Sequence, residues 1–161
     1  MVMINKTTST SDSPQVIAPP PLIYLGGLAV GIILHWINPL PFLQENLTLP
    51  LGVSLIIISI ILVITAFRAF KKAKTNIDPR KPTTSIVSTG LYRFTRNPIY
   101  LSMTLLILGI AIWVNTLWIL VMLVPVLLVM QFGVIVREEA YLTKKFGKEY
   151  FRYKSRVRQW I

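Results

Sequence analysis

Long apolar stretches alternate with short polar ones along this chain. Four stretches, residues 21–37, 49–70, 99–114 and 117–136, are almost free of charge. A helix needs about 20 consecutive apolar residues to cross a bilayer, so each stretch is expected to form a transmembrane helix. The third stretch is short for ~30 Å of hydrocarbon, and we expect it to tilt or to include residues from Leu91 onward.

The polar segments set the expected topology. Residues 71–98 and the tail from residue 137 onward are strongly basic, whereas the link after the first stretch and the turn at 115–116 are not. Basic segments favour the cytoplasmic side, so both termini and the middle loop are expected there, in a protein of the cytoplasmic (inner) membrane. The two-residue turn requires the last two helices to form an antiparallel hairpin. Residues 1–20 are polar and rich in proline, have no signal-peptide layout, and predict a disordered cytoplasmic tail.

Composition supports this reading. Hydrophobic residues make up 53% of the 161 residues, and the mean hydropathy is +0.62. The net charge of +11 could indicate nucleic-acid binding, but the basic residues flank apolar stretches, which favours membrane topology. The chain has no cysteine and one histidine, His35, which argues against a metal site.

Small residues let membrane helices approach closely, so Gly26, Gly27 and Gly31 are expected to mark a packing face.

The predicted fold is therefore an all-α, polytopic membrane protein. It has four transmembrane helices, followed by a carboxyl-terminal interfacial helix whose charges and aromatic residues suit the headgroup region. After the disordered tail at 1–20, residues 21–161 form one domain. The oligomeric state stays open at this point.

The expected hairpin brings two distant polar segments to one membrane face. Residues 96–100 precede the third helix, and residues 137–139 follow the fourth. Acidic residues are scarce in this chain, yet Glu138 and Glu139 stand together at the carboxyl end of an apolar helix, where the helix dipole disfavours negative charge. Arginines of the two segments, or a cationic ligand, could compensate these carboxylates.

Other residues of these segments also have structural interpretations. Arg96 could serve only to anchor the helix at the membrane edge. Tyr92 and Tyr100 could be ordinary interfacial aromatic residues. The pair Asn97-Pro98 is typical of a helix start, with asparagine as the cap and proline in the first turn.

Two segments carry a resemblance to known enzymes. "TGLYRFTRNPIYLS", then a helical hairpin, then "REEAYLTKKFGKEYFRYKSRVRQW", resembles the isoprenylcysteine carboxyl methyltransferase family of integral membrane enzymes and the related phospholipid N-methyltransferases. The resemblance covers about residues 84–160, and the two motifs at this spacing are specific together. It implies S-adenosylmethionine as methyl donor, bound by about residues 75–161 and reached from the cytosol.

The chemistry of this donor suggests roles for some residues, and the resemblance implies others. Arg96 suits the donor's carboxylate, because a guanidinium offers a forked pair of N–H groups. Glu139 or Tyr100 could assist if an amine acceptor has to lose a proton. The prenylcysteine enzymes typically carry histidine where this chain has Asn97, which cannot titrate near neutral pH, so a prenylcysteine substrate is less well supported. The residues implied to bind the cofactor are Thr84, Ser85, Ile86, Val87, Tyr92, Asn97, Pro98, Ile99, Tyr100 and Glu138.

The expected reaction is an in-line displacement at the methyl carbon. The acceptor is expected to be lipophilic, a carboxylate or an amine, and to arrive from the bilayer through a gap near Pro125. One alternative is a sterol-reductase-like membrane enzyme that uses a nicotinamide cofactor. Another is a small non-enzymatic scaffold whose basic edges bind anionic lipids. The expected partners are the bilayer and the acceptor, and not nucleic acid.

Overall fold

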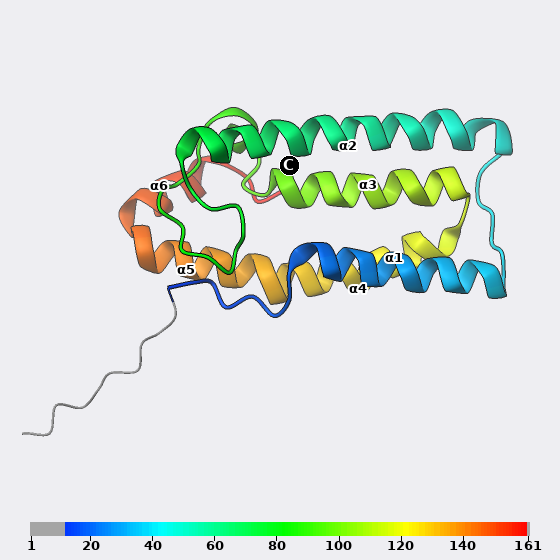
Figure 1. Cartoon of the computed structure of the whole chain (residues 1–161), viewed down its shortest axis with the longest axis horizontal. Coiled ribbons are helices and arrows are strands. Elements are labelled where there is room, and N and C mark those ends of the chain that lie inside the picture. Colours follow the sequence, from blue (N-terminus) through cyan, green and yellow to red (C-terminus); the bar gives the residue numbers. More distant parts are fainter. Residues whose placement is uncertain (1–11, 161) are drawn as a thin grey trace, which may run out of the picture.

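The computed structural model describes residues 12–160, and within that range it contains helices and no β-strand. The long helices form two pairs: α2 packs along α3, and α1 packs along α4 (Figure 1). Shorter helices lie at one end of the pairs (Figure 1). The elements are α1 (Pro20–Ile37), α2 (Glu45–Ala73), η1 (Gly90–Arg93), α3 (Pro98–Val114), α4 (Leu117–Met130), η2 (Gln131–Ile135), α5 (Val136–Phe146) and α6 (Lys148–Arg156).

Glycines bring the paired helices into close contact. A Cβ added at Gly109 on α3 would lie 2.9 Å from the carbonyl oxygen of Gly52 on α2, so no side chain fits between these backbones. Gly27 and Gly31 on α1 face α4 in the same way, as the sequence predicted. Gly26 does not take part in this packing within the chain, because a Cβ there meets no atom within 4 Å, and packing between copies of the chain stays a prediction for it.

The α3–α4 hairpin forms as predicted. Asn115 has a left-handed backbone conformation (φ 54°) and ends α3. Its side-chain oxygen accepts hydrogen bonds from the backbone N–H groups of Phe42 and Leu43, both at 3.0 Å. The hairpin turn and the α1–α2 link therefore meet at the end of the molecule opposite the shorter helices (Figure 1).

The fourth apolar stretch continues further than the sequence indicated. α4, the π-helical turn η2 and α5 form one helical run, Leu117–Phe146. This run, α1 and α2 are the three described helices that are long and apolar enough to cross a membrane. α3 is also apolar but has only 17 residues, so length alone does not establish the predicted count of four spans. Gly147, with φ 52°, separates α5 from α6.

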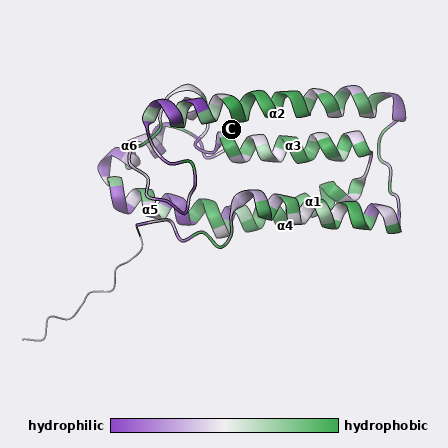
Figure 2. Ribbon diagram, in the orientation of Figure 1, coloured by the Kyte–Doolittle hydropathy of each residue, from purple (hydrophilic) through white to green (hydrophobic). Residues whose placement is uncertain are grey.

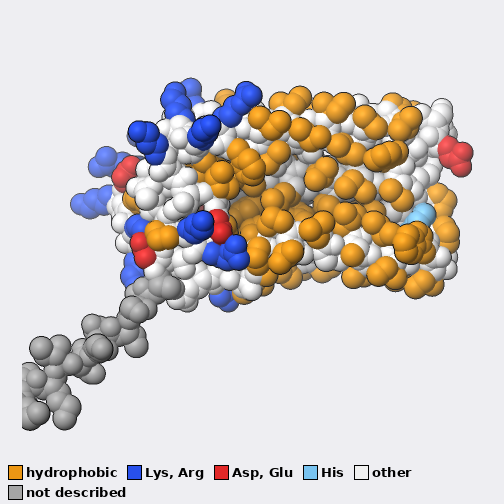
Figure 3. Space-filling model, viewed as in Figure 1, with side chains coloured by type: hydrophobic (Ala, Val, Ile, Leu, Met, Phe, Trp, Pro, Cys, Tyr) orange, Lys and Arg blue, Asp and Glu red, His pale blue; other side chains and the backbone are white. Residues whose placement is uncertain are grey.

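Polar and apolar residues occupy different parts of the molecule. The long helices are hydrophobic along most of their length, and the hydrophilic residues gather around α5, α6 and the α2–α3 connection (Figure 2). On the face seen in Figure 3, lysine and arginine side chains cluster at this same end, which we call the polar end.

A segment expected to be disordered is in contact with the helices. Of the predicted tail, residues 1–11 lie outside the described range, but residues 12–19 run along α5 to the start of α1 (Figure 1). We call residues 12–19 the amino-terminal strap. Pro14 is buried and Val16 packs against the core, so part of this polar segment has apolar surface to bury.

Candidate active site

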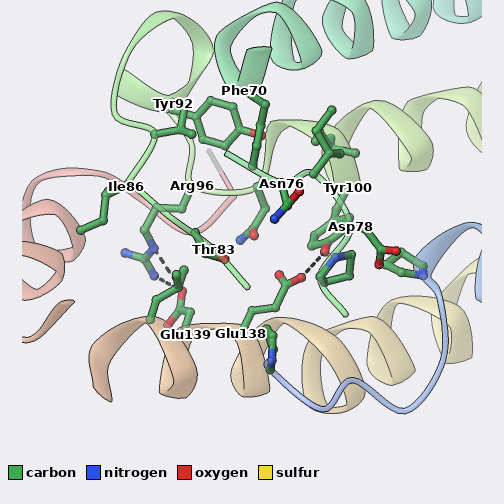
Figure 4. A pocket seen from close by; sticks show the side chains of 18 of the residues that line it. Phe70, Asn76, Asp78, Thr83, Ile86, Tyr92, Arg96, Tyr100, Glu138 and Glu139 are labelled. Atoms are coloured by element: carbon green, nitrogen blue, oxygen red, sulfur yellow. Dashed lines mark hydrogen bonds and ion pairs between the residues drawn. The ribbon is translucent and has the colours of Figure 1, made fainter. Parts of the chain in front are cut away.

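A cavity of about 520 Å³ lies at the polar end. Its walls come from the start of α1, from α2, α3, α5 and α6, from the α2–α3 connection and from the amino-terminal strap (Figure 4). This volume is within the range of ligand pockets, ~300–1,000 Å³. Segments distant in the sequence therefore enclose one space large enough for a nucleoside-sized ligand.

Glu138 presents an unpaired carboxylate to this cavity. Its Oε1 accepts a hydrogen bond of 2.6 Å from the hydroxyl of Tyr100, and both side chains line the cavity (Figure 4). Within residues 12–160 it forms no ion pair. A carboxylate removed from water without a cation is costly, so this position favours either the neutral acid or a cationic ligand group beside it.

Glu139, the next residue, has the opposite environment. Its Oε1 accepts hydrogen bonds from Nε (3.1 Å) and Nη2 (2.7 Å) of Arg96, and its Oε2 pairs with Nζ of Lys154 at 2.6 Å. The side chains of Glu139 and Arg96 are only 12% and 10% exposed. Both oxygens are thus engaged by cations, so neither is left free to receive a ligand group without breaking an ion pair.

Arg96 has little capacity left for a ligand. Besides bonding Glu139, its Nη1 donates to the backbone oxygens of Lys154 (3.0 Å) and Val157 (2.7 Å). A guanidinium has five N–H groups, and four of them are used in these contacts. The forked contact with a donor carboxylate expected from the sequence would require this network to rearrange. In this structure Arg96 holds the carboxyl-terminal region against α3 and α5.

Asn97 begins α3, as predicted, but its side chain does not cap the helix. Its Nδ2 donates to the backbone oxygen of Gln159 at 3.0 Å, and the Thr95 hydroxyl donates to the same oxygen at 3.2 Å. The Asn97 side chain does not cap α3 because it is bonded to the backbone oxygen of Gln159 instead. This bond holds the segment around Gln159 beside the start of α3.

Aromatic side chains form the other side of the cavity. Phe70 and Tyr92 meet edge to face with ring centroids 5.5 Å apart. The Tyr153 hydroxyl donates to the backbone oxygen of Tyr92 at 2.8 Å, and both Tyr153 and Tyr150 line the cavity. Burial raises the pKa values of Tyr92, Tyr150 and Tyr153 well above the ordinary range, so these hydroxyls stay neutral at physiological pH.

Most of the residues implicated by the sequence lie around this cavity. Thr84 and Pro98 do not line it. The Thr84 hydroxyl instead donates to the backbone oxygen of Lys74 at 3.1 Å, which attaches the connection to the end of α2. Arg137, considered as a partner for the carboxylates, donates to the backbone oxygen of Gln15 in the strap. The residues that do line it are Ser85, Ile86, Val87, Tyr92, Arg96, Asn97, Ile99, Tyr100, Glu138 and Glu139.

Several other lining residues were not assigned to the site from the sequence. Phe67 and Phe70 on α2, and Tyr150 and Tyr153 on α6, are aromatic pairs spaced by three, which places each pair on one helix face. This spacing is a usable signal, but it is equally typical of interfacial aromatic residues. The contribution of the strap through Pro14 has no sequence signal that we recognise.

Comparison with known proteins assigns the chain to a family. A segment of 63 residues, 38% of the chain, is 46% identical to an uncharacterized protein of Haemophilus influenzae and covers 98% of it. No solved structure matches the chain significantly. The phospholipid methyltransferase family model matches residues 47–149, which include α3, Arg96, Glu138 and Glu139. The chain therefore belongs to the phospholipid methyltransferase family of membrane methyltransferases.

Proposed function

We propose that this protein transfers a methyl group from S-adenosylmethionine to a lipophilic acceptor at the membrane surface. Family membership supports methyl transfer to lipids in general. The observation that carries the choice of donor is the carboxylate of Glu138, which lies at the cavity with a hydroxyl partner and no ion pair among the described residues.

The residues around the cavity fit this donor. When bound, S-adenosylmethionine supplies a methyl group on a positively charged sulfur, which an acceptor atom can take in one displacement. Glu138 offers negative charge to a cationic group, and the faces of Phe70 and Tyr92 offer a further favourable environment for a cation or an adenine ring. No group of three possible metal ligands occurs among residues 12–160, and the proposed reaction needs none.

The contribution of the protein is alignment and exclusion of water. Arg96 and Glu139 are assigned positioning roles, because their contacts hold α3, α5 and the carboxyl-terminal region together. A carboxylate acceptor needs no proton removal. An amine acceptor does, and Glu138 with Tyr100 is better suited to receive that proton than the doubly paired Glu139.

The acceptor is proposed to approach from the bilayer between α1 and α2. Phe67 on α2, Met103 on α3 and Pro21 on α1 form an apolar part of the cavity lining. α1 and α2 belong to different helix pairs and make little contact with each other, which supports a lateral path to the site between them. Pro125 does not line the cavity, which argues against the entrance expected there.

We further propose that α3 is a fourth span and that both termini face the cytoplasm. Seventeen residues of helix extend about 26 Å. α3 begins at the polar end, and its far end meets the α1–α2 link through Asn115, so it extends as far as the opposite end of the bundle. Because the chain has no cysteine, single cysteines at Glu45 and Lys144 can be tested with a membrane-impermeant maleimide. Labelling of the two positions from the same side of the membrane would contradict this topology.

The donor assignment is tested by calorimetry in detergent with S-adenosylmethionine and its demethylated product. We expect binding by the wild type and roughly 10- to 100-fold weaker binding by Glu138→Gln, because a hydrogen bond to a charged group contributes ~1.5–3 kcal/mol. Glu149→Gln on α6 is the matched control, because Glu149 does not line the cavity. Equal binding by both variants sinks the role of Glu138. Binding of a nicotinamide cofactor in place of the donor would favour a reductase, and binding of neither would favour a lipid-binding scaffold.

A further inference from the structure

The amino-terminal strap contacts α5 and the preceding turn at regular intervals. The backbone N–H of Ile17 donates to the oxygen of Gly133 at 3.2 Å. Nη1 of Arg137 donates to the backbone oxygen of Gln15 at 3.0 Å. Asp12 accepts hydrogen bonds from the Tyr141 hydroxyl (2.8 Å) and from Nζ of Lys145 (2.7 and 2.8 Å). The strap therefore runs antiparallel to this helical segment.

These helix partners form one line on the helical surface. Residues 133, 137, 141 and 145 are spaced by four, and in an α-helix such residues lie on the same face. Glu138 and Leu142, one position further along, line the cavity. One helix thus holds the strap along one stripe and presents the site along the adjacent stripe.

The strap also forms part of the cavity wall. Pro14 and Pro19 are among the lining residues. Tyr141 connects the strap to the α2–α3 connection, because its hydroxyl also accepts a hydrogen bond of 3.3 Å from the backbone N–H of Thr83, another lining residue. Two separate segments that enclose the cavity therefore meet at one tyrosine.

The two ends of the strap are held by different contacts, and both Ile17 and the side chain of Asp12 are more than half exposed. At Ile17 the side chain fills the space over Gly133, where any added Cβ would collide with it. At the other end, the side chains of Asp12 and Lys145 are 57% and 28% exposed, and exposed ion pairs contribute little. The strap can therefore detach from its Asp12 end while the segment near Pro19 stays fixed at the start of α1.

We propose that the amino-terminal strap is a movable wall of the ligand cavity, which leaves α5 to admit and release the methyl donor and closes over the bound donor. The identity of the ligand rests on the proposed function. The strap itself lies outside residues 47–149, the part of the chain matched by the family model, whereas the residues of η2 and α5 that hold it lie inside that range.

A single cysteine can measure the detachment directly, because the chain has none of its own. Val16→Cys places a thiol where the strap packs against the core, and its rate of alkylation by a bulky maleimide in detergent reports the open fraction. We expect Asp12→Asn to raise this rate roughly two- to five-fold, in line with an exposed ion pair. Gly133→Ala should raise it more, by roughly ten-fold or above, because the new methyl group displaces Ile17.

The ligand dependence completes the test. The demethylated donor product should slow the alkylation, and Asp12→Asn should speed its dissociation by the same factor as it speeds alkylation. Lys144→Met removes the lysine next to Lys145 and should change neither rate, since Lys145 is the lysine that contacts the strap. Circular dichroism checks that Gly133→Ala keeps its helices.

The outcomes separate the two proposals. If Asp12→Asn and Gly133→Ala leave alkylation unchanged, the docked strap is refuted. If the product binds but its dissociation rate is the same in the strap variants, the movable wall is refuted and the proposed function stands. If the variants change alkylation but neither donor nor product binds, the proposed function fails while the docked strap stands.

Discussion

At the apolar end of the molecule, α2 and α3 meet where Gly52 and Gly109 allow the two backbones to touch. At the polar end, α3 and α5 meet through Arg96 and Glu139, whose charges are largely removed from solvent. The contact between α2 and α3 depends on how closely the two helix surfaces fit, and many neighbouring side chains contribute to this packing. The contact between α3 and α5 depends on a few atoms at which a cation, a carboxylate and backbone oxygens converge.

This difference has consequences for the site. A close-packed interface loses stability gradually as it is altered, whereas a buried charge network is sensitive to loss of any one partner. The network around Arg96 joins α3, α5 and the carboxyl-terminal region, so it fixes the elements that carry Tyr100 and Glu138. Glu138 itself contributes no ion pair to that network. Stability is therefore expected to depend on Glu139, and ligand binding on Glu138.

The largest effect on stability is expected from Arg96→Met. It removes every hydrogen bond from the guanidinium and leaves Glu139, 12% exposed, with Lys154 as its remaining cation. Breaking a buried ion pair by removing one partner costs about 3 kcal/mol or more, so the thermal midpoint in detergent should fall by several degrees. A double-mutant cycle with Glu139→Gln should show strong coupling. Additive effects of the two substitutions would mean that the pair contributes little.

A smaller effect is expected in the apolar region from Gly109→Ala. Its new Cβ would lie 2.9 Å from the oxygen of Gly52 and 2.8 Å from Cγ1 of Ile56, so α2 and α3 must move apart. Overpacking of this kind costs ~1–3 kcal/mol. Gly26→Ala is the matched control on α1, since a Cβ there meets nothing within 4 Å, and it should be neutral or slightly stabilising. Equal thermal midpoints for the two variants would contradict the packing argument.

The sequence was sufficient to locate the long apolar helices, and to give the bounds of α1 and α3, because hydrophobic length is a local property. The starts and ends of α1 and α3 agree with prediction to within one residue, since proline at the start and Asn115 at the end act through their own backbone. The family could also be identified, because Arg96–Tyr100 and Glu138–Glu139 stand in recognisable motifs.

Contacts between distant segments could not be read in the same way. The local charge pattern does not predict the different partners of Glu138 and Glu139. Glu138 is bonded by a hydroxyl and Glu139 is bound by two cations, because the two residues lie about 100° apart on the helix. The role of residues 12–19 was missed for the same reason. Their partners are more than 110 positions away, and a polar, proline-rich segment resembles a disordered tail until its neighbours are known.

Tyr24 lies where the two helix pairs meet, and its substitution should have a smaller effect than either change above. Its buried hydroxyl on α1 lies 3.2 Å from the backbone oxygen of Tyr100 and 2.9 Å from the Thr104 hydroxyl, and donates its one proton to one of them. Tyr24→Phe should cost ~1 kcal/mol, because Tyr100 keeps its second hydrogen bond from Thr104. Thr65→Val on α2 is the control, because that hydroxyl is exposed and bonds within its own helix. A thermal midpoint of Tyr24→Phe equal to that of the control would show that other contacts join the two helix pairs.

The smallest effect is expected from pH at the strap. Hydrogen bonds from Lys145 and Tyr141 lower the pKa of Asp12 below its ordinary value, so the contribution of its carboxylate is complete at neutral pH. Since the folded-state pKa is the lower one, this contribution is lost only as the pH falls below about 4, through that value. A spin label on Val16→Cys should therefore show constant mobility from pH 8 to 5 and become more mobile below that range. In Asp12→Asn the label should already be more mobile at pH 7 and should not respond further to acid. A transition near pH 6 or 7 in the wild type would mean that another group controls the strap, and the ion pair of Asp12 with Lys145 would then not be what holds its free end against α5.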